Sequence, residues 1–157
     1  MQNEGWVLPT PDMIRKYMNR FLEEKCEPKL MSPLALAFVG DSVYDLFVRE
    51  YLLCEANRQV NKLHSEAVKK VKAQAQAQAY KKIADILTEE ENEIFRRGKN
   101  AHTKHTPKNA TSIDYHVATA MECLFGYLYL KGSIDRLREL FYIINSEEVP
   151  DEEKNTP

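Results

Sequence analysis

Two acidic residues stand inside two otherwise apolar stretches of the chain. Residues 34–48 (LALAFVGDSVYDLFV) include Asp41 near their centre, and residues 117–130 (VATAMECLFGYLYL) include Glu122 as their only charge. An ionised carboxylate that leaves water is destabilising unless a cation meets it, and neither stretch contains Lys or Arg. The partner must be a distant side chain, a helix N-terminus or a metal ion. If the stretches pack together, Asp41 and Glu122 could share one hard cation.

Helix start signals surround both stretches and predict an all-α protein. Thr10-Pro11 and Ser32-Pro33 each have the pattern of an N-cap followed by Pro in the first turn. The TEEE sequence from Thr88 has the pattern of a capping box. The expected helices cover residues 10–25, 32–54, 61–84 (as part of a helical hairpin), 88–98, 112–131 and 133 onward.

Both apolar stretches are hydrophobic around most of the helix circumference, which is typical of a helix in a core or an interface. A domain of 157 residues has little room for two such helices. We therefore expect self-association through residues 34–48, with a fully intramolecular core as the alternative. Gly40 and Gly126 would let helix backbones approach closely.

The composition is that of an ordinary folded domain. The 157 residues are 43% hydrophobic and 29% charged, which suits one core. Residues 1–146 are expected to form the domain, and residues 147–157, with five acids and one Lys, a disordered acidic tail. No apolar run reaches the roughly 18–20 residues of a membrane span, and the N-terminus lacks signal-peptide features. A cytoplasmic protein without membrane contact is predicted.

The three cysteines do not predict a disulfide framework or a zinc site, because they are far apart and form no CxxC pair. Cys123 lies next to Glu122 and could be a nucleophile. We interpret it as a small buried hydrophobe, because burial raises the pKa of a thiol and suppresses its reactivity.

Charge is distributed unevenly. Residues 58–108 contain twelve Lys or Arg and six acids, four of which lie in residues 89–93. This separation can build a local positive face, although a merely solvated helical surface explains it equally well. Within this region, residues 96–109 (RRGKNAHTKHTPKN) hold five Lys or Arg and no acid. Because they precede the stretch with Glu122, their end must approach that acid.

The first apolar stretch resembles the signature helix of the ribonuclease III family, whose usual form is ERLEFLGDSVL. The match centres on residues 38–43, FVGDSV. Residues 118–130 (ATAMECLFGYLYL) are similar to the family's ADxxEAxxGAxYLD helix. The two motifs occur in the family's order. The resemblance implies an all-α ribonuclease III endonuclease-domain fold that forms a homodimer through the signature helix, with two active sites across one valley.

Within that family, the chain most resembles the short Mini-ribonuclease III branch, which has the nuclease domain and no double-stranded-RNA-binding domain. The LALAFxGD variant, and residues 97–101 (RGKNA) leading to residues 106–109 (TPKN), are features of that branch. The short stretch after the last expected helix leaves no room for an RNA-binding domain. The resemblance implies an endoribonuclease that cleaves double-stranded RNA and matures the ends of precursor 23S (large-subunit) ribosomal RNA. It leaves open whether a large-subunit ribosomal protein is a further partner.

The resemblance also implies that Asp41 and Glu122 bind Mg²⁺, which Mn²⁺ could replace, for phosphodiester hydrolysis by a metal-activated water. Three habitual acids of the family are missing, because Leu34, Ala37 and Thr119 occupy their positions. Mg²⁺ tolerates a site with few carboxylates, since it keeps waters and accepts phosphate oxygens as ligands. Whether one ion or two bind stays open; a second would depend on RNA oxygens or on waters held by groups such as Thr119.

The basic segment of residues 96–109 is interpreted as a clamp on the RNA backbone, with a mobile exposed loop as the alternative. Phosphate contacts position a duplex, and A-form RNA is recognised largely by its shape. The expected RNA-binding residues are Arg96, Arg97, Lys99, Asn100, Lys104, Lys108 and Asn109.

Two other functions compete with the nuclease. One is a catalytically weak, double-stranded-RNA-binding scaffold of the same fold. The missing acids favour it, but the retention of Asp41 and Glu122 opposes it, because a pure binder has no need for uncompensated carboxylates in a core. The other is a helical metal phosphohydrolase of the HD type. The chain contains no His-Asp dipeptide, and this alternative requires the two apolar helices to lie far apart.

Overall fold

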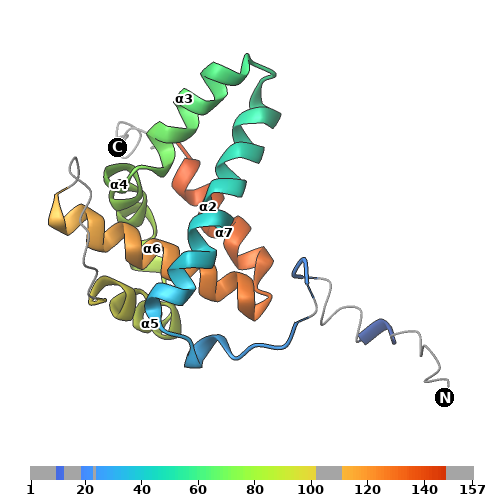
Figure 1. The fold of residues 1–157 in the computed structure, drawn as a ribbon, viewed down its shortest axis with the longest axis vertical. Coiled ribbons are helices and arrows are strands. Elements are labelled where there is room, and N and C mark those ends of the chain that lie inside the picture. Colours follow the sequence, from blue (N-terminus) through green and yellow to red (C-terminus); the bar gives the residue numbers. More distant parts are fainter. Residues whose placement is uncertain (1–9, 13–18, 23, 102–110, 148–157) are drawn as a thin grey trace, which may run out of the picture.

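The computed structural model describes residues 10–12, 19–22, 24–101 and 111–147, and within these ranges all regular structure is helical. The prediction of an all-α fold is therefore confirmed (Figure 1). None of the helices in the described ranges is long and apolar enough to cross a bilayer. The elements are η1 (Pro28–Leu30), α2 (Pro33–Glu55), α3 (Val60–Val71), α4 (Ala73–Ile83), η2 (Ala84–Ile86), α5 (Glu89–Lys99), α6 (Ser112–Lys131) and α7 (Ile134–Asn145).

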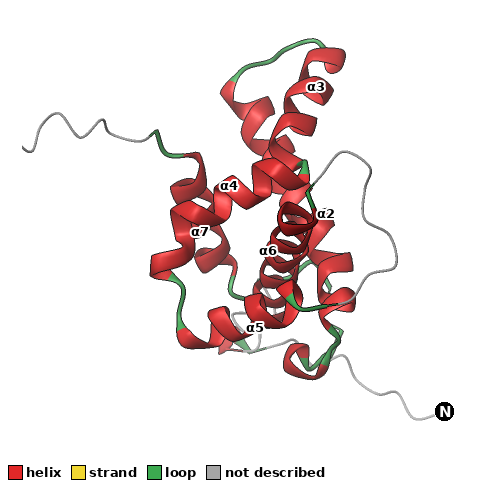
Figure 2. Ribbon diagram, turned by 90° about the vertical axis from the view of Figure 1, so that its left-hand side faces the viewer, coloured by secondary structure: helices red, strands yellow, loops and turns green. Residues whose placement is uncertain are grey.

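Helix α6 is the centre of the molecule. It contacts α2, α4, α5 and α7, which surround it (Figure 2). Every residue of α6 from Val117 to Leu128 is buried except Glu122, which is half-buried. The all-round hydrophobicity of this helix is thus explained by an intramolecular core, because each of its faces packs against a neighbour.

Helix α2 is apolar for a different reason. One side of it packs on α6 through buried residues such as Leu36 and Val48. Its other side leaves Phe38 81% exposed, together with the partly exposed Leu46 and Leu53. Large apolar side chains on one face of a helix suit an interface better than contact with water.

The predicted helix ends are set by local hydrogen bonds. The Ser32 hydroxyl accepts from the backbone N–H of Ala35 at 3.2 Å and begins α2. Thr88 and Glu91 form the expected capping box at the start of α5, with reciprocal side-chain to backbone bonds of 3.2 and 2.9 Å. Gly132 ends α6 at φ 82°, a left-handed conformation that glycine adopts without steric cost.

The predicted helix over residues 10–25 does not reach its expected end, and residues 13–18 and 23 lie outside the described residues. Residues 11 and 12 are helical, but residues 19–22 and 24–27 are not. The backbone N–H of Phe21 donates to the hydroxyl of Tyr129 at 2.9 Å, and the two rings are 5.7 Å apart. This tertiary contact with α6 replaces the local hydrogen bonds that a helix would need.

The segment of residues 61–84 is largely helical, as predicted, but Lys72 divides it into two helices, α3 and α4. Lys72 has an extended conformation, with ψ at 152°. Its neighbours are good helix formers, so intrinsic propensity does not explain the break. Instead, α3 packs on α2, whereas α4 packs on α6 and α7. The chain must turn between these two supports, and tertiary packing overrides propensity.

A buried ion pair ties α5 to α7. The Glu91 carboxylate, in a residue only 5% exposed, accepts from the Arg136 guanidinium at 2.8 and 2.9 Å. Arg136 also donates to the Ile86 carbonyl at 2.8 Å. Burial opposes ionisation of Glu91, but the bonds from Arg136 and from the Thr88 backbone lower its pKa below the ordinary value. This acid is therefore neutralised from within the fold.

Candidate active site

Asp41 and Glu122 are brought together by the crossing of α2 and α6. At the crossing, a Cβ atom on Gly40 would overlap the carbonyl oxygen of Glu122 and lie 2.7 Å from the backbone nitrogen of Gly126. A Cβ on Gly126 would likewise overlap the carbonyl oxygen of Leu36. Only glycine permits this close approach. Because Asp41 follows Gly40 directly, the same contact places it beside Glu122.

The two carboxylates interact electrostatically. Asp41 is exposed, whereas Glu122 is half-buried. Burial, and then the negative charge of Asp41, raise the pKa of Glu122 to about 7. A hydrogen bond from Gln76 acts in the opposite direction. A carboxylate whose ionisation is disfavoured by a neighbouring negative charge is stabilised when a cation binds beside both groups.

No cationic side chain in the described part of the chain fills that role. Among the described residues, no ion pair involves Asp41 or Glu122. Asp45, one turn after Asp41, is paired with Arg49 at 2.7 Å. Uncompensated carboxylate oxygens are the donors that a hard divalent cation such as Mg²⁺ prefers. The residues present therefore fit a metal ion.

The donor set is small. The described part of the chain contains no group of three or more His, Cys, Asp or Glu side chains that could hold a metal. Of the positions where the family has further acids, Leu34 is partly exposed and Ala37 is buried. Thr119 is also buried, and its hydroxyl donates to the Tyr115 carbonyl at 3.1 Å. The structure thus brings together Asp41 and Glu122 alone of the acids discussed for this site.

Sequence reasoning missed one residue of this site, Gln76 on α4. Its side-chain amide donates to the Glu122 carboxylate at 3.2 Å and to the Val71 carbonyl at 2.9 Å. The sequence around it, AQAQAQA, offers three glutamines in near-identical contexts, at positions 74, 76 and 78. Gln76 alone of the three reaches Glu122, because of how α4 packs on α6. No signal in the sequence distinguishes it from the other two.

Cys123, the neighbour of Glu122, is fully buried, and its thiol donates to the Pro33 carbonyl at 2.7 Å. Burial, and then the charge of Glu122, raise the pKa of this thiol to about 12. At that value the thiolate is a negligible fraction at neutral pH. The interpretation of Cys123 as a packing residue is confirmed.

The first residues of the predicted RNA clamp lie at the end of α5. Arg96, Lys99 and Asn100 are exposed, and Arg96 lies 3.6 Å from Glu93 in an exposed ion pair. Surface pairs of this kind are weak and exchange readily. These three side chains are therefore accessible to a ligand. Lys104, Lys108 and Asn109 lie outside the described residues.

Arg97 differs from its neighbours. Its guanidinium donates to the Met31 carbonyl at 2.9 Å and to the Lys29 carbonyl at 3.3 Å. Both acceptors belong to the segment that leads into α2. Arg97 thus fixes the entry to the signature helix, and part of its hydrogen-bonding capacity is used within the fold.

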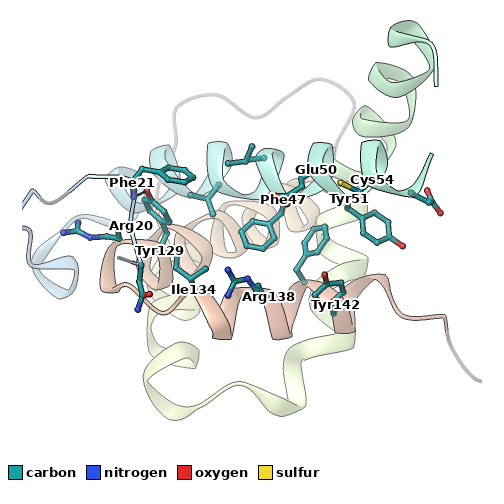
Figure 3. Close-up of a pocket in the computed structure, with 15 residues that line it drawn as sticks. Arg20, Phe21, Phe47, Glu50, Tyr51, Cys54, Tyr129, Ile134, Arg138 and Tyr142 are labelled. Carbon is teal, nitrogen blue, oxygen red and sulfur yellow. Dashed lines mark hydrogen bonds between the residues drawn. The ribbon is translucent and has the colours of Figure 1, made fainter. Parts of the chain in front are cut away.

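Two pockets lie away from the acid pair. One, of about 710 Å³, is formed by α2, α7 and the segment before η1, with Phe47, Tyr51 and Tyr142 among its walls (Figure 3). The other, of about 740 Å³, lies around Glu90 and Arg136. Neither Asp41 nor Glu122 lines them. Asp41 is exposed, so the acid pair can be reached from the surface without entering either of these two cavities.

Known proteins match both the sequence and this arrangement. A family model described as Ribonuclease III domain matches residues 34–133, a range that includes both acids. The chain belongs to the ribonuclease III family. The Mini-ribonuclease 3 of Thermoanaerobacter sp. is 49% identical over 110 residues, which cover 70% of this chain and 78% of the relative. That of Clostridium tetani is 41% identical over 135 residues, covering 83% and 87%.

A solved structure agrees with this assignment. An X-ray crystal structure of a protein from Fusobacterium nucleatum is similar with a TM-score of 0.71 at 32% identity, covering 76% of this chain and 98% of that one. The expected resemblance to Mini-ribonuclease III and the expected fold are thus confirmed. This protein is an endoribonuclease of the ribonuclease III type, and the HD-type alternative is excluded, since α2 and α6 pack closely.

Proposed function

We propose that this ribonuclease III-type enzyme cleaves double-stranded RNA with Mg²⁺ held by Asp41 and Glu122. The observation that supports it best is the acid pair at the α2–α6 crossing. Asp41 is exposed and Glu122 is half-buried, and no Lys or Arg among the described residues neutralises either of them. Members of the ribonuclease III family generally depend on divalent metal ions and act on double-stranded RNA. Mn²⁺ is expected to replace Mg²⁺, because it accepts the same oxygen ligands.

The two acids have different tasks in this proposal. The ion, when bound, supplies charge stabilisation for phosphodiester hydrolysis and favours deprotonation of a water. Asp41, which is exposed, reaches the side of the site where substrate arrives. Glu122 is anchored behind it on the central helix and is held by Gln76, so its carboxylate keeps a fixed orientation. The fixed Glu122 and the accessible Asp41 would together determine where the metal ion binds.

RNA binding is assigned to basic and amide side chains at the end of α5 and in the segment that follows it. Arg96, Lys99 and Asn100 are accessible there, and Lys104, Lys108 and Asn109 continue the basic segment toward α6. Side chains of this kind bind phosphates without selecting bases, as recognition of A-form RNA requires. Arg97 contributes mainly by holding the segment before α2.

The active form is proposed to be a homodimer through α2. Phe38 is 81% exposed on a helix whose opposite side packs in the core, and Leu46 and Leu53 are partly exposed on the same helix. A second copy of the same face would remove these side chains from water. Two copies would also supply two acid pairs, one for each strand of a duplex.

The substrate is proposed to be precursor 23S ribosomal RNA, whose ends the enzyme would mature in the cytoplasm, with a large-subunit ribosomal protein as a candidate partner. The names of the relatives support the branch of the family from which this proposal comes. The chain's own surface supports the substrate class, because Asp41 is exposed, and Arg96 and Lys99 are exposed on α5, which packs against the helix of Glu122.

One experiment tests the proposal against the competing RNA-binding scaffold. The protein is incubated with a precursor 23S duplex, an unrelated duplex of equal length and a single strand, each with Mg²⁺ or with EDTA. Metal-dependent cleavage of both duplexes, lost in Asp41→Asn, is expected, with the ribosomal duplex cleaved fastest. Binding of the duplex without any cleavage would favour the scaffold. Equal cleavage of the two duplexes would remove the ribosomal assignment.

A further inference from the structure

The Gln76 side chain is buried to an unusual degree for an amide. The residue is only 2% exposed, and it lies on α4 near the buried Ala77 and Ala79. Its Nε2 donates to the Val71 carbonyl at 2.9 Å and to Glu122 Oε1 at 3.2 Å. Its Oε1 is buried and has no hydrogen-bond partner in the described part of the protein.

Packing alone does not explain an amide at this position. Methionine, which has nearly the same length, would fit among the alanines and leave no polar oxygen unsatisfied. A buried acceptor without a partner lowers stability, whereas an apolar group of the same shape does not. The Val71 bond satisfies a carbonyl near the end of α3, but it uses only one of the two donors and leaves Oε1 unexplained.

A role in the candidate active site would explain why an amide occupies this buried position, because Gln76 links a backbone carbonyl to the Glu122 carboxylate. Val71 immediately precedes the break at Lys72, so its carbonyl is a fixed backbone anchor between α3 and α4. The same nitrogen bonds one oxygen of Glu122 and leaves the other oxygen of that carboxylate available. The unsatisfied Oε1 belongs to the same amide group, and a neutral amide oxygen is an acceptor suited to a hydrated divalent cation.

We propose that Gln76 is a positioning residue of the nuclease, which orients the Glu122 carboxylate for the metal ion and offers its amide oxygen to that ion's hydration shell. This inference rests on the proposed function of the acid pair. Partners outside the direct ligand shell commonly fix the orientation of a ligand, and their loss typically weakens metal affinity or activity by about 10- to 100-fold.

The test compares three variants of the full chain. Gln76→Met removes both donors and keeps the length. Gln76→Asn keeps an amide but withdraws it by one methylene, and it also serves if Gln76→Met does not fold. Gln78→Met, at an exposed position of the same helix, is the matched control. Binding of Mn²⁺ without RNA is measured by electron paramagnetic resonance, and thermal midpoints and cleavage kinetics are measured in parallel.

Both Gln76 variants are expected to weaken Mn²⁺ binding by about 10- to 100-fold and to lower kcat, with KM for the duplex unchanged. Gln78→Met should match the wild type. In a Glu122→Gln background, adding Gln76→Met should weaken Mn²⁺ binding by a smaller factor than in the wild type, because Gln76 acts in part through that carboxylate.

The proposal is overturned if Gln76→Met lowers the thermal midpoint but binds Mn²⁺ and turns over duplex RNA like the wild type. That result would make the amide a structural clasp between α3 and α4. Failure of the proposed function gives a different result, since the wild type itself would then cleave no duplex RNA with any divalent metal.

Discussion

Glu91 and Glu122 are the same residue type, both lie in helices that pack in the core, and they meet opposite environments. Glu91 is 5% exposed and receives two bonds from Arg136, at 2.8 and 2.9 Å, as well as a backbone N–H at the start of α5. Glu122 has no described cation near it and has a second acid, Asp41, as its electrostatic neighbour. The pKa of Glu91 is lowered, whereas that of Glu122 is raised to about 7. The fold neutralises Glu91 itself and leaves Glu122 without a cationic partner among the described residues.

Under the proposed function, the difference separates residues that maintain the fold from residues that serve the reaction. A buried acid with a good partner is strongly destabilising only when the pair is broken. A buried acid without a partner disfavours the folded state in the absence of metal, so removing its charge should help folding and harm function. Substitutions at the two sites are therefore expected to have opposite signs.

The largest expected effect is on catalysis at the unpaired site. Asp41→Asn should lower kcat for duplex cleavage by at least about 1,000-fold, because metal-dependent charge stabilisation contributes several kcal/mol. The thermal midpoint should not fall. Asp45→Asn, one turn later on α2, is the matched control and should keep cleavage, since Asp45 already pairs with the exposed Arg49. Single-turnover cleavage rates check both, and full activity in Asp41→Asn would end the metal assignment.

The next effect is on stability at the paired site. Glu91→Gln should lower the free energy of unfolding by about 3 kcal/mol, because it leaves the largely buried Arg136 guanidinium without its counter-ion. Cleavage per folded molecule should be unchanged. Asp135→Asn breaks the exposed pair with Arg138 and should have no measurable effect. Urea unfolding at fixed protein concentration measures both, and an equal loss in the two variants would contradict the comparison.

The third expected effect is a gain in stability at the unpaired site, opposite in sign to the loss expected for Glu91→Gln. The pKa of Glu122 rises from 4.5 in the unfolded chain to about 7 in the fold, so the folded state binds more protons between these values and stability falls as pH rises through this window. Glu122→Gln removes the ionisable group and therefore this pH-dependent loss of stability. Without metal, it should be about 2 kcal/mol more stable than the wild type at pH 8, a figure reduced from the full shift because the side chain is half-buried.

At pH 5 the two proteins should be almost equally stable, because Glu122 is then protonated in the fold. Chemical unfolding at the two pH values in EDTA measures the difference. A Glu122→Gln variant that is less stable than the wild type at pH 8 would show that the carboxylate has a stabilising partner after all.

Residue type and spacing were enough to predict several helix ends and the meeting of the two acids. Ser32-Pro33, Thr88 with Glu91, and Gly132 determine helix ends through short-range hydrogen bonds and backbone conformation, so local sequence suffices for them. The convergence of Asp41 and Glu122 was predictable as well, because an unpaired acid in an apolar helix needs a partner outside that helix.

The parts that could not be predicted depend on contacts distant in sequence. Lys72 interrupts a run of good helix formers because α3 and α4 pack on different helices. Gln76 becomes a site residue, and Gln78 a surface residue, through the orientation of α4 against α6 alone. Arg97 looks identical to Arg96 in the sequence, yet its guanidinium is bonded to carbonyls 66 and 68 residues away.

The smallest effect tests whether an external cation does for Glu122 what Arg136 does for Glu91. A metal ion that binds only the folded state stabilises it by about 1.4 kcal/mol when its free concentration is ten times its Kd. Mg²⁺ or Mn²⁺ should therefore raise the thermal midpoint of the wild type and of Glu91→Gln, but not of Glu122→Gln. The rise should shrink as pH falls below about 7, because the proton then competes with the metal for the Glu122 carboxylate. Equal stabilisation of Glu122→Gln would mean that the ion binds elsewhere, and the two glutamates would then differ in burial partners but not in function.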